Sequence, residues 1–84
     1  MRRYLVLAMR TPAFDPAIGG PHRAFLDDLR ARGALELAGG FGDGSGGAYV
    51  VLAASLDAAR HIAHADPLHV TGASVLTVWE WNAA

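Results

Sequence analysis

The hydrophobic positions along the chain predict short strands and helices in alternation. Tyr4–Met9 is an uninterrupted apolar run, and its short length favours a buried strand over a helix. The segment Thr11–Gly20 contains prolines and glycines without any period and predicts a loop. Pro21 then predicts the first residue of a helix, because its fixed φ suits that position and its missing N–H costs nothing there. Gly33 is placed to end the helix in the left-handed conformation. The buried stripe of this helix is Phe25, Leu26 and Leu29.

The second half of the chain predicts a hairpin, a helix and a last strand. Leu35–Ala38 alternates between apolar and polar positions, and Gly39–Phe41 continues this strand weakly, either with a bulge or with backbone left bare for a ligand. The glycine-rich segment Gly42–Gly47 predicts a plain turn, with a flexible lid as the alternative. The remaining predictions are a strand over Ala48–Ala53 that is apolar on both faces, a helix capped by Ser55 and ending at Asp66, a connecting turn over Leu68–Gly72, and a strand over Ser74–Trp81.

The resulting order, βαββαβ, is that of the ferredoxin-like fold, an α+β class in which both helices cover one face of an antiparallel sheet. Because the third strand has no polar side, the opposite face of the sheet also needs cover. We therefore expect a symmetric homodimer in which sheet packs on sheet. Trp79 or Trp81 would anchor this contact, since large aromatic side chains dominate interface energies.

Composition limits how such a domain is stabilised and which partners it takes. The 84 residues suffice for one small domain over 1–84, marginal alone, and without cysteine neither disulfides nor thiol chemistry are available. The net charge of -1 argues against nucleic acid and against anionic membranes as partners. The first apolar run is too short for a signal peptide and is interrupted by Arg10, and no run reaches the length of a membrane span. We expect a cytoplasmic protein that is stabilised by oligomerisation.

The candidate chemistry lies at Asp66-Pro67. Proline disfavours helical angles at the residue before it, so Asp66 is expected to be the last residue of the second helix. A carboxylate there faces the negative end of the helix dipole, so it is either solvated or paired. The candidate partner is His22, at the start of the first helix on its apolar side. A neutral imidazole is a competent general base, and a nearby carboxylate would orient it and stabilise its cation. The alternative is that His22 packs on Phe25 and bonds a backbone carbonyl.

A series of short motifs then runs over nearly the whole chain. It consists of His22 with Phe25-Leu26 and Leu29, then Gly33, Leu37-Ala38-Gly39-Gly40, Gly46-Gly47, Ser55-Leu56-Asp57-Ala58-Ala59 and Ala65-Asp66-Pro67. In order and spacing these motifs resemble the YCII-related (YciI-like) proteins. The resemblance implies a ferredoxin-like fold that dimerises as an α+β barrel, and a proposed active site made of a His–Asp dyad, here His22 and Asp66. It also implies a lyase-like reaction, because some relatives are linked to dehydrochlorination of hydroxylated aromatics.

Three further residues are candidates for binding a substrate beside this pair. His69 follows the Asp66-Pro67 turn closely enough to reach the same pocket, and Gly40 and Phe41 lie where the second strand leaves its backbone bare. A metal site built from His61, His64, Asp66 and His69 is the alternative use of the histidines. The apolar stripe of the second helix places His61 and His64 on its solvated side, so we expect no metal.

Three functions remain open from the sequence. The first is a small acid–base enzyme, lyase-like and without a cofactor, in which His22 removes a proton from a small, possibly aromatic substrate while Asp66 orients the imidazole. The second is a non-catalytic dimeric domain that binds a small molecule or a partner, with the pair as a structural hydrogen bond. The third is a cofactor-free monooxygenase, which no particular residue favours.

Overall fold

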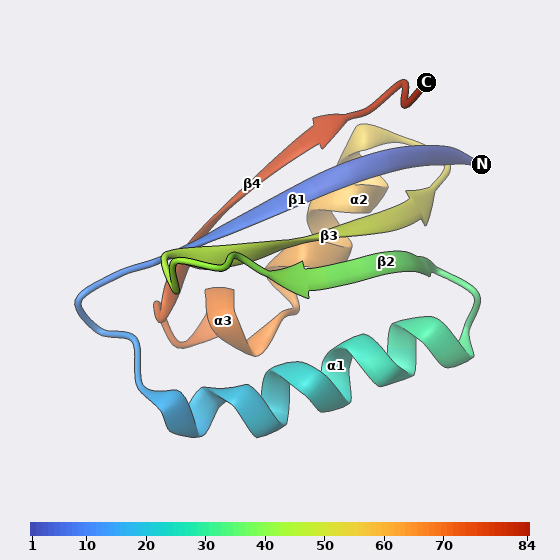
Figure 1. Ribbon diagram of the computed structural model, residues 1–84. Coiled ribbons are helices and arrows are strands. Elements are labelled where there is room, and N and C mark those ends of the chain that lie inside the picture. Colours follow the sequence, from blue (N-terminus) through green and yellow to red (C-terminus); the bar gives the residue numbers. More distant parts are fainter.

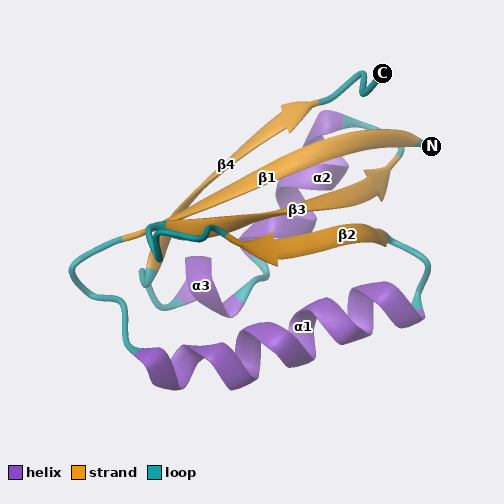
Figure 2. Ribbon diagram, in the orientation of Figure 1, coloured by secondary structure: helices purple, strands orange, loops and turns teal.

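Four strands form one antiparallel sheet in the order β2-β3-β1-β4, and three helices accompany it (Figures 1 and 2). The computed structural model describes residues 1–84. Its elements are β1 (Arg2–Arg10), the 3-10 turn η1 (Pro16–Ile18), α1 (Gly19–Ala31), β2 (Leu35–Gly40), β3 (Gly46–Ala53), α2 (Leu56–His64), α3 (Pro67–Val70) and β4 (Ser74–Glu80). The predicted ferredoxin-like βαββαβ order is confirmed, with α3 as an addition between α2 and β4.

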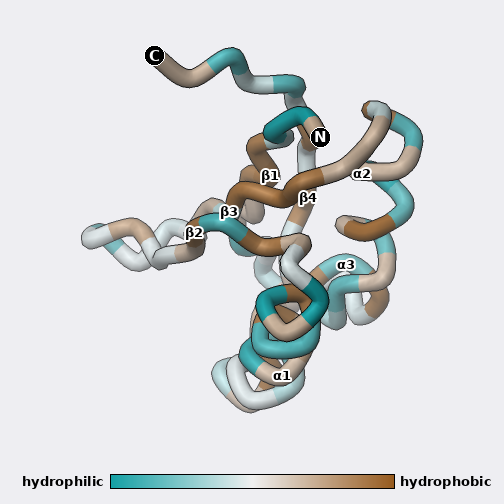
Figure 3. The backbone as a smooth tube through the Cα atoms, turned by 90° about the vertical axis from the view of Figure 1, so that its right-hand side faces the viewer, coloured by the Kyte–Doolittle hydropathy of each residue, from teal (hydrophilic) through white to brown (hydrophobic).

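The helices cover one face of the sheet. Along β1 the side chains of Tyr4, Val6 and Ala8 are buried on this face, while the residues between them are less covered. Leu29 of α1 belongs to the same core cluster as the small residues of α2, which puts both helices on the same side. The cluster consists of Tyr4, Val6, Leu29, Leu35, Tyr49, Val51, Ala53, Ala59 and Ala63. Figure 3 shows the hydrophobic stretches gathered along the strands of the sheet.

The first helix begins two residues earlier than Pro21 predicts. Asp15 caps η1 by accepting a hydrogen bond from the N–H of Ala17, and α1 follows directly from Gly19. Pro21 fits inside the first turn because the first four N–H groups of a helix have no partner within it. The end of α1 is as predicted, because Gly33 is in the left-handed conformation with φ 72°. The N–H of Ala34 donates to Leu29 O at 2.9 Å, which is the hydrogen bond of a Schellman motif.

The second helix ends earlier than predicted, and this changes the role of Asp66. Ser55 caps α2 as expected, accepting from the N–H of Ala58, but the helix stops at His64. Asp66 has extended backbone angles and is the N-cap of the short helix α3, in which Pro67 is the first residue. The expectation that Asp66 closes α2 and that Leu68–Gly72 forms a plain turn is therefore wrong. Proline excluded helical angles at Asp66, as the sequence indicated, but it also started a new helix after it.

The hairpin of β2 and β3 has its irregularity at the start of β2. The register shifts between Leu35 and Leu37, and not at Gly39-Gly40, where the sequence predicts a possible bulge. The pairing Gly39↔Ala48 and Gly40↔Gly47 is regular, and the turn between the strands spans residues 41–45. These glycines therefore lie in paired strands at the end of the hairpin that approaches the start of α1.

The opposite face of the sheet carries no helix and is apolar. Leu37, Val75 and Trp79 are 65%, 60% and 59% exposed, and the strand register puts them on the side of Leu5 and Val50. This is the second apolar face that the sequence predicted from the strand Ala48–Ala53. None of the helices combines the length and the hydrophobicity that a membrane-spanning helix requires.

Candidate functional site

Asp66 is a fully buried carboxylate with three hydrogen-bond donors around it. Its Oδ1 accepts from the backbone N–H of Leu68 at 2.9 Å and lies 2.9 Å from Nδ1 of His22. Its Oδ2 accepts from the hydroxyl of Tyr49 at 2.8 Å. An ionised carboxylate only accepts hydrogen bonds, and the two directed donors, the N–H of Leu68 and the hydroxyl of Tyr49, match the charged form of Asp66. Burying such a charge is costly unless it is hydrogen-bonded, and here the donors come from α1, β3 and α3.

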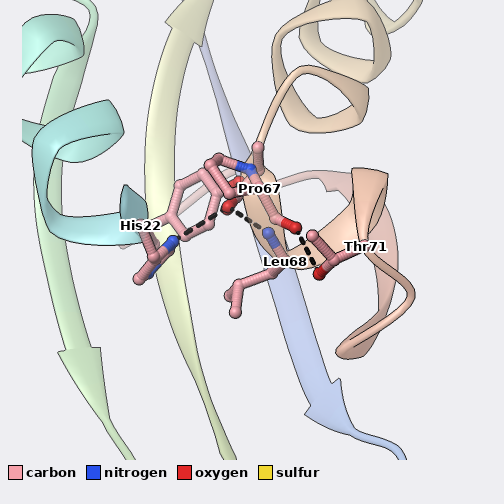
Figure 4. Close-up of polar contacts among 6 residues, drawn as sticks. His22, Pro67, Leu68 and Thr71 are labelled. Atoms are coloured by element: carbon pink, nitrogen blue, oxygen red, sulfur yellow. Dashed lines mark hydrogen bonds and ion pairs between the residues drawn. The ribbon is translucent and has the colours of Figure 1, made fainter. Parts of the chain in front are cut away.

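His22 is held on two sides and open on a third. It lies in the first turn of α1, and Figure 4 shows it meeting α3 near Leu68. Because the Asp66 carboxylate accepts, the proton of a neutral imidazole belongs on Nδ1, which leaves Nε2 as the acceptor. The ring packs against Tyr49, with 6.0 Å between the ring centroids, and 23% of the side chain is exposed. The imidazole is thus oriented, with its basic nitrogen not used by the protein.

Tyr49 completes the arrangement from the centre of the sheet. Its ring also contacts Phe25 edge-on, with centroids 6.4 Å apart, and it is 3% exposed. Burial raises the pKa of the Tyr49 phenol above its usual range, and the charge of Asp66 and the hydrogen bond to it act in the same direction. The phenol therefore remains a donor to Asp66 over the whole physiological pH range. A tyrosinate beside the buried carboxylate is disfavoured.

A cavity of about 430 Å³ opens beside His22. Its volume is in the range of small-molecule sites. Its wall combines apolar side chains, bare strand backbone and charged groups at the rim. The lining residues are Ala8, Arg10, Phe14, Ile18, Gly19, His22, Arg23, Leu26, Asp27, Arg30, Ala38, Gly39, Gly40, Gly46, Gly47, Ala48, Tyr49, Leu68 and Ser74. His22 and Tyr49 line it directly, and Asp66 lies behind them.

The structure brings together only part of the predicted site. His22 and Asp66 are in contact, and Gly40 lines the cavity. Phe41 and His69 do not line it, contrary to the expectation that they reach this pocket. Phe41 is in the hairpin turn and 40% exposed, and His69 lies on the outer side of α3 because its stacking partner is His64, at 4.5 Å between ring centroids. The helix formed after Pro67 turned His69 away from the carboxylate.

The remaining histidines form no metal cluster. No group of three or more histidine or acidic side chains is positioned to hold a metal ion. His61 and His64 are exposed on α2, as its apolar stripe indicated.

Sequence reasoning missed the part that Tyr49 plays. The sequence pattern gives Tyr49 only a place in the apolar strand Ala48–Ala53 and predicts no hydrogen bond from it to Asp66. A signal was present in the alternation of the strand: Tyr49, Val51 and Ala53 share the buried face, and a buried phenol usually has a hydrogen-bond partner. The signal is not decisive, because the hydroxyl of the buried Tyr4 has no partner. Only the position of α3 shows that the partner of Tyr49 is Asp66.

Comparisons with known proteins agree with this fold. The sequence model of the YCII-related domain matches residues 3–82. A relative from Bacillus subtilis (strain 168), the uncharacterized protein YjpA, is 48% identical over 82 residues, which are 98% of this chain and 96% of that protein. Among solved structures, the 5-chloro-2-hydroxyhydroquinone dehydrochlorinase from Burkholderia phenoliruptrix AC1100, in complex with 2,5-dihydroxybenzoquinone, is similar with a TM-score of 0.73. That likeness covers 98% of this chain and 95% of the other at 19% identity, so it supports the fold alone.

Proposed function

The chain belongs to the YCII-related domain family, and on this premise we propose that it is a small acid–base enzyme of lyase type with His22 as its general base. The observation that carries the proposal is the 2.9 Å contact between His22 Nδ1 and a fully buried carboxylate, at the edge of a cavity. This contact leaves Nε2, the basic nitrogen, available to a molecule bound in that cavity.

The proposed step is the removal of a proton from the substrate by Nε2 of His22. The imidazolium that forms keeps its Nδ1–H bond to Asp66 and becomes the cation of a partly buried ion pair. Tyr49 and the N–H of Leu68 hold the carboxylate in place during the transfer. Such orientation favours the transition state because no group has to move when the charge appears. The proton leaves to water when His22 returns to its neutral form.

A hydroxylated ring is the substrate class that we propose for this step. The similar dehydrochlorinase binds 2,5-dihydroxybenzoquinone in its solved complex. In this chain the cavity offers apolar walls from Phe14, Ile18 and Leu26 to such a ring. Loss of HCl from 5-chloro-2-hydroxyhydroquinone gives a hydroxyquinone: one hydroxyl proton moves to the ring carbon that carries chlorine, a base takes a second hydroxyl proton, and chloride leaves that carbon with its bonding electrons. His22 is the group in the cavity suited to that task.

The test is release of chloride from 5-chloro-2-hydroxyhydroquinone and related chlorinated hydroquinones. We expect His22→Ala to lower kcat by roughly 10²–10⁴-fold, the usual contribution of a general base, with an unchanged far-UV spectrum. His61→Ala is the matched control, because His61 is exposed on α2 and away from the cavity. Equal rates for the wild type and the His22→Ala variant would refute the role of His22.

Asp66→Asn separates this function from the non-catalytic alternative. An amide cannot accept from all three donors at once, so in either case we expect the free energy of unfolding to fall by about 1–3 kcal/mol. Only the enzyme also loses turnover in this variant when it is assayed below its unfolding range. Stability is read from urea unfolding and turnover from chloride release, so the two effects are measured independently.

We also propose that the protein acts as a cytoplasmic homodimer whose subunits pack through the helix-free face of the sheet. Support comes from the exposure of Leu37, Val75 and Trp79 on one continuous face. Large exposed apolar patches mark interaction sites in soluble proteins. A second copy presents the same face and can cover it symmetrically.

A further inference from the structure

The pairing of the arginines distinguishes the cavity from the rest of the surface. The chain has seven basic residues, all arginine. Five of them form ion pairs with carboxylates of the chain: Arg2 with Glu80, Arg3 with Glu36, Arg30 with Asp27, Arg32 with Asp28 and Arg60 with Asp57. The two without a carboxylate partner are Arg10 and Arg23, and both line the cavity.

The carboxylates near the cavity offset these two charges only in part. Asp27 lines the cavity but is paired with Arg30 at 3.1 Å, and the two charges cancel locally. Asp66 keeps its negative charge, but it lies behind the lining and is bonded to His22, Tyr49 and Leu68, so it offsets at most one of the two arginine charges. The cavity therefore presents excess positive charge in a protein whose net charge is -1.

Arg10 is positioned before any ligand arrives. Its guanidinium carbon lies 4.0 Å from the centroid of the Phe14 ring, a cation–π contact between two lining residues. Its backbone N–H donates to Ser45 O at 3.0 Å, which ties the end of β1 to the hairpin turn. A planar guanidinium held in this way keeps its N–H edge free to bind an anion, either the two oxygens of a carboxylate or the single oxygen of an ionised hydroxyl.

The rest of the lining restricts the shape of the ligand. Beside Phe14, the cavity has an apolar wall from Ile18 and Leu26 and a flat wall of glycine backbone from β2 and β3. Glycines that carry no side chain leave room for a planar ring to lie against the strands. With about 430 Å³, the space suits a single ring with substituents.

We propose that the cavity selects a small planar organic anion, with its negative oxygen held by Arg10 and attracted by Arg23 while its ring lies beside His22. This inference rests on the proposed function, since it takes the cavity to be the substrate site. It goes further by specifying that the substrate is an anion, which neither the contact of His22 with Asp66 nor the fold indicates. An anionic ring is also easier to place beside a base that must become a cation.

The test compares two probes of nearly equal shape, 2,5-dihydroxybenzoate and its neutral amide, 2,5-dihydroxybenzamide. Calorimetric titration of the wild-type protein at neutral pH should give a Kd for the benzoate at least ~10-fold below that of the amide, as for a charge-assisted hydrogen bond. Arg10→Gln should remove most of this preference and leave the affinity for the amide unchanged. Arg60→Gln is the matched control, because Arg60 is exposed on α2 and paired with Asp57 outside the cavity.

Three results would overturn the inference: equal affinity for the two probes, no saturable binding of the benzoate, or equal losses from Arg10→Gln and Arg60→Gln. His22→Ala should keep the preference for the anion, since the positive charge comes from the arginines. Loss of the preference in this variant would contradict the role proposed for Arg10 and Arg23. The titration requires no turnover. Selective anion binding without chloride release therefore refutes the proposed enzyme alone, and chloride release without selectivity refutes this inference alone.

Discussion

The Asp66 side chain is the point at which the residues of the site meet. It is fully buried, and its donors lie 44, 17 and 2 residues away along the chain, in His22, Tyr49 and Leu68. The nearest donor is local and belongs to the cap of α3, so it follows from Pro67. The other two exist only because α1 and β3 pack around the start of α3. A single carboxylate thus joins three elements, and its substitution is expected to disturb more than one of them.

Tyr49 allows the hydrogen bond to Asp66 to be tested without emptying the core. Tyr49→Phe removes the donor and keeps the ring contacts with His22 and Phe25. We expect the free energy of unfolding at neutral pH to fall by about 1 kcal/mol, the net value of a typical hydrogen bond. Urea unfolding measures the change, and an unchanged stability would contradict the role assigned to the phenol.

Tyr49→Phe should also differ from the wild type in how the free energy of unfolding depends on pH in alkaline solution. Because the folded protein raises the pKa of Tyr49, the unfolded chain loses this proton first, near the ordinary pKa of about 10. The stabilisation is therefore fully present below pH ~10 and is lost as the pH rises above it, since ionisation favours the unfolded state. Stability measured against pH should fall less steeply above ~10 in Tyr49→Phe than in the wild type.

At the scale of elements, the hairpin of β2 and β3 shows why glycine is required at one position and not at its neighbour. A Cβ on Gly47 would lie 2.6 Å from Gly39 O, closer than side-chain atoms approach backbone. A Cβ on Gly39 would meet nothing within 4 Å. Both glycines line the cavity. Gly47 is required for the two strands to pair closely, whereas Gly39 only leaves the cavity wall without a side chain.

We expect Gly47→Ala to destabilise the protein by roughly 1–3 kcal/mol, as overpacking usually does, because β2 and β3 must move apart. Gly39→Ala should change the free energy of unfolding by less than about 1 kcal/mol. Thermal unfolding followed by circular dichroism compares the two variants. A larger loss from Gly39→Ala than from Gly47→Ala would show that the strands pair differently from the register described above.

The elements also show where local patterns suffice. The apolar runs predicted β1, β3 and β4 within two residues, and the glycine at the end of α1 and the serine before α2 act as expected. Periodicity did not predict α3, because four residues are too few to show a helical stripe. It also missed the start of α1, where the cap of η1 at Asp15 decides how the chain enters the helix.

At the scale of the whole molecule, the sheet has one covered and one uncovered apolar face. An 84-residue domain buries only about 60% of its unfolded surface, so a second copy on the uncovered face would add stability that one chain lacks. Trp79 is 59% exposed on this face and pairs in register with Leu5 of β1. Its substitution tests the interface without touching the cavity.

We expect light scattering after gel filtration to give twice the chain mass of 8.8 kDa for the wild type. Trp79→Glu should shift the protein to the mass of one chain and lower its melting temperature, because a charge in an apolar interface is left unpaired. His61→Glu, on the exposed side of α2, is the control and should keep the mass of the wild type. A monomeric wild type would refute the homodimer.

The sequence by itself determined the fold class, the order of the elements and the second apolar face of the sheet, because these follow from local backbone preferences and from which side chains avoid water. It also indicated His22 and Asp66 as a pair, first from the residues at the ends of the two helices and then from a family resemblance. The tertiary structure decided how these two residues are used. It alone showed that Tyr49 bonds the same carboxylate, that His69 lies on the outside, and that Arg10 rests on Phe14 at the cavity. Such contacts join residues far apart in the chain, and their geometry depends on how whole elements pack.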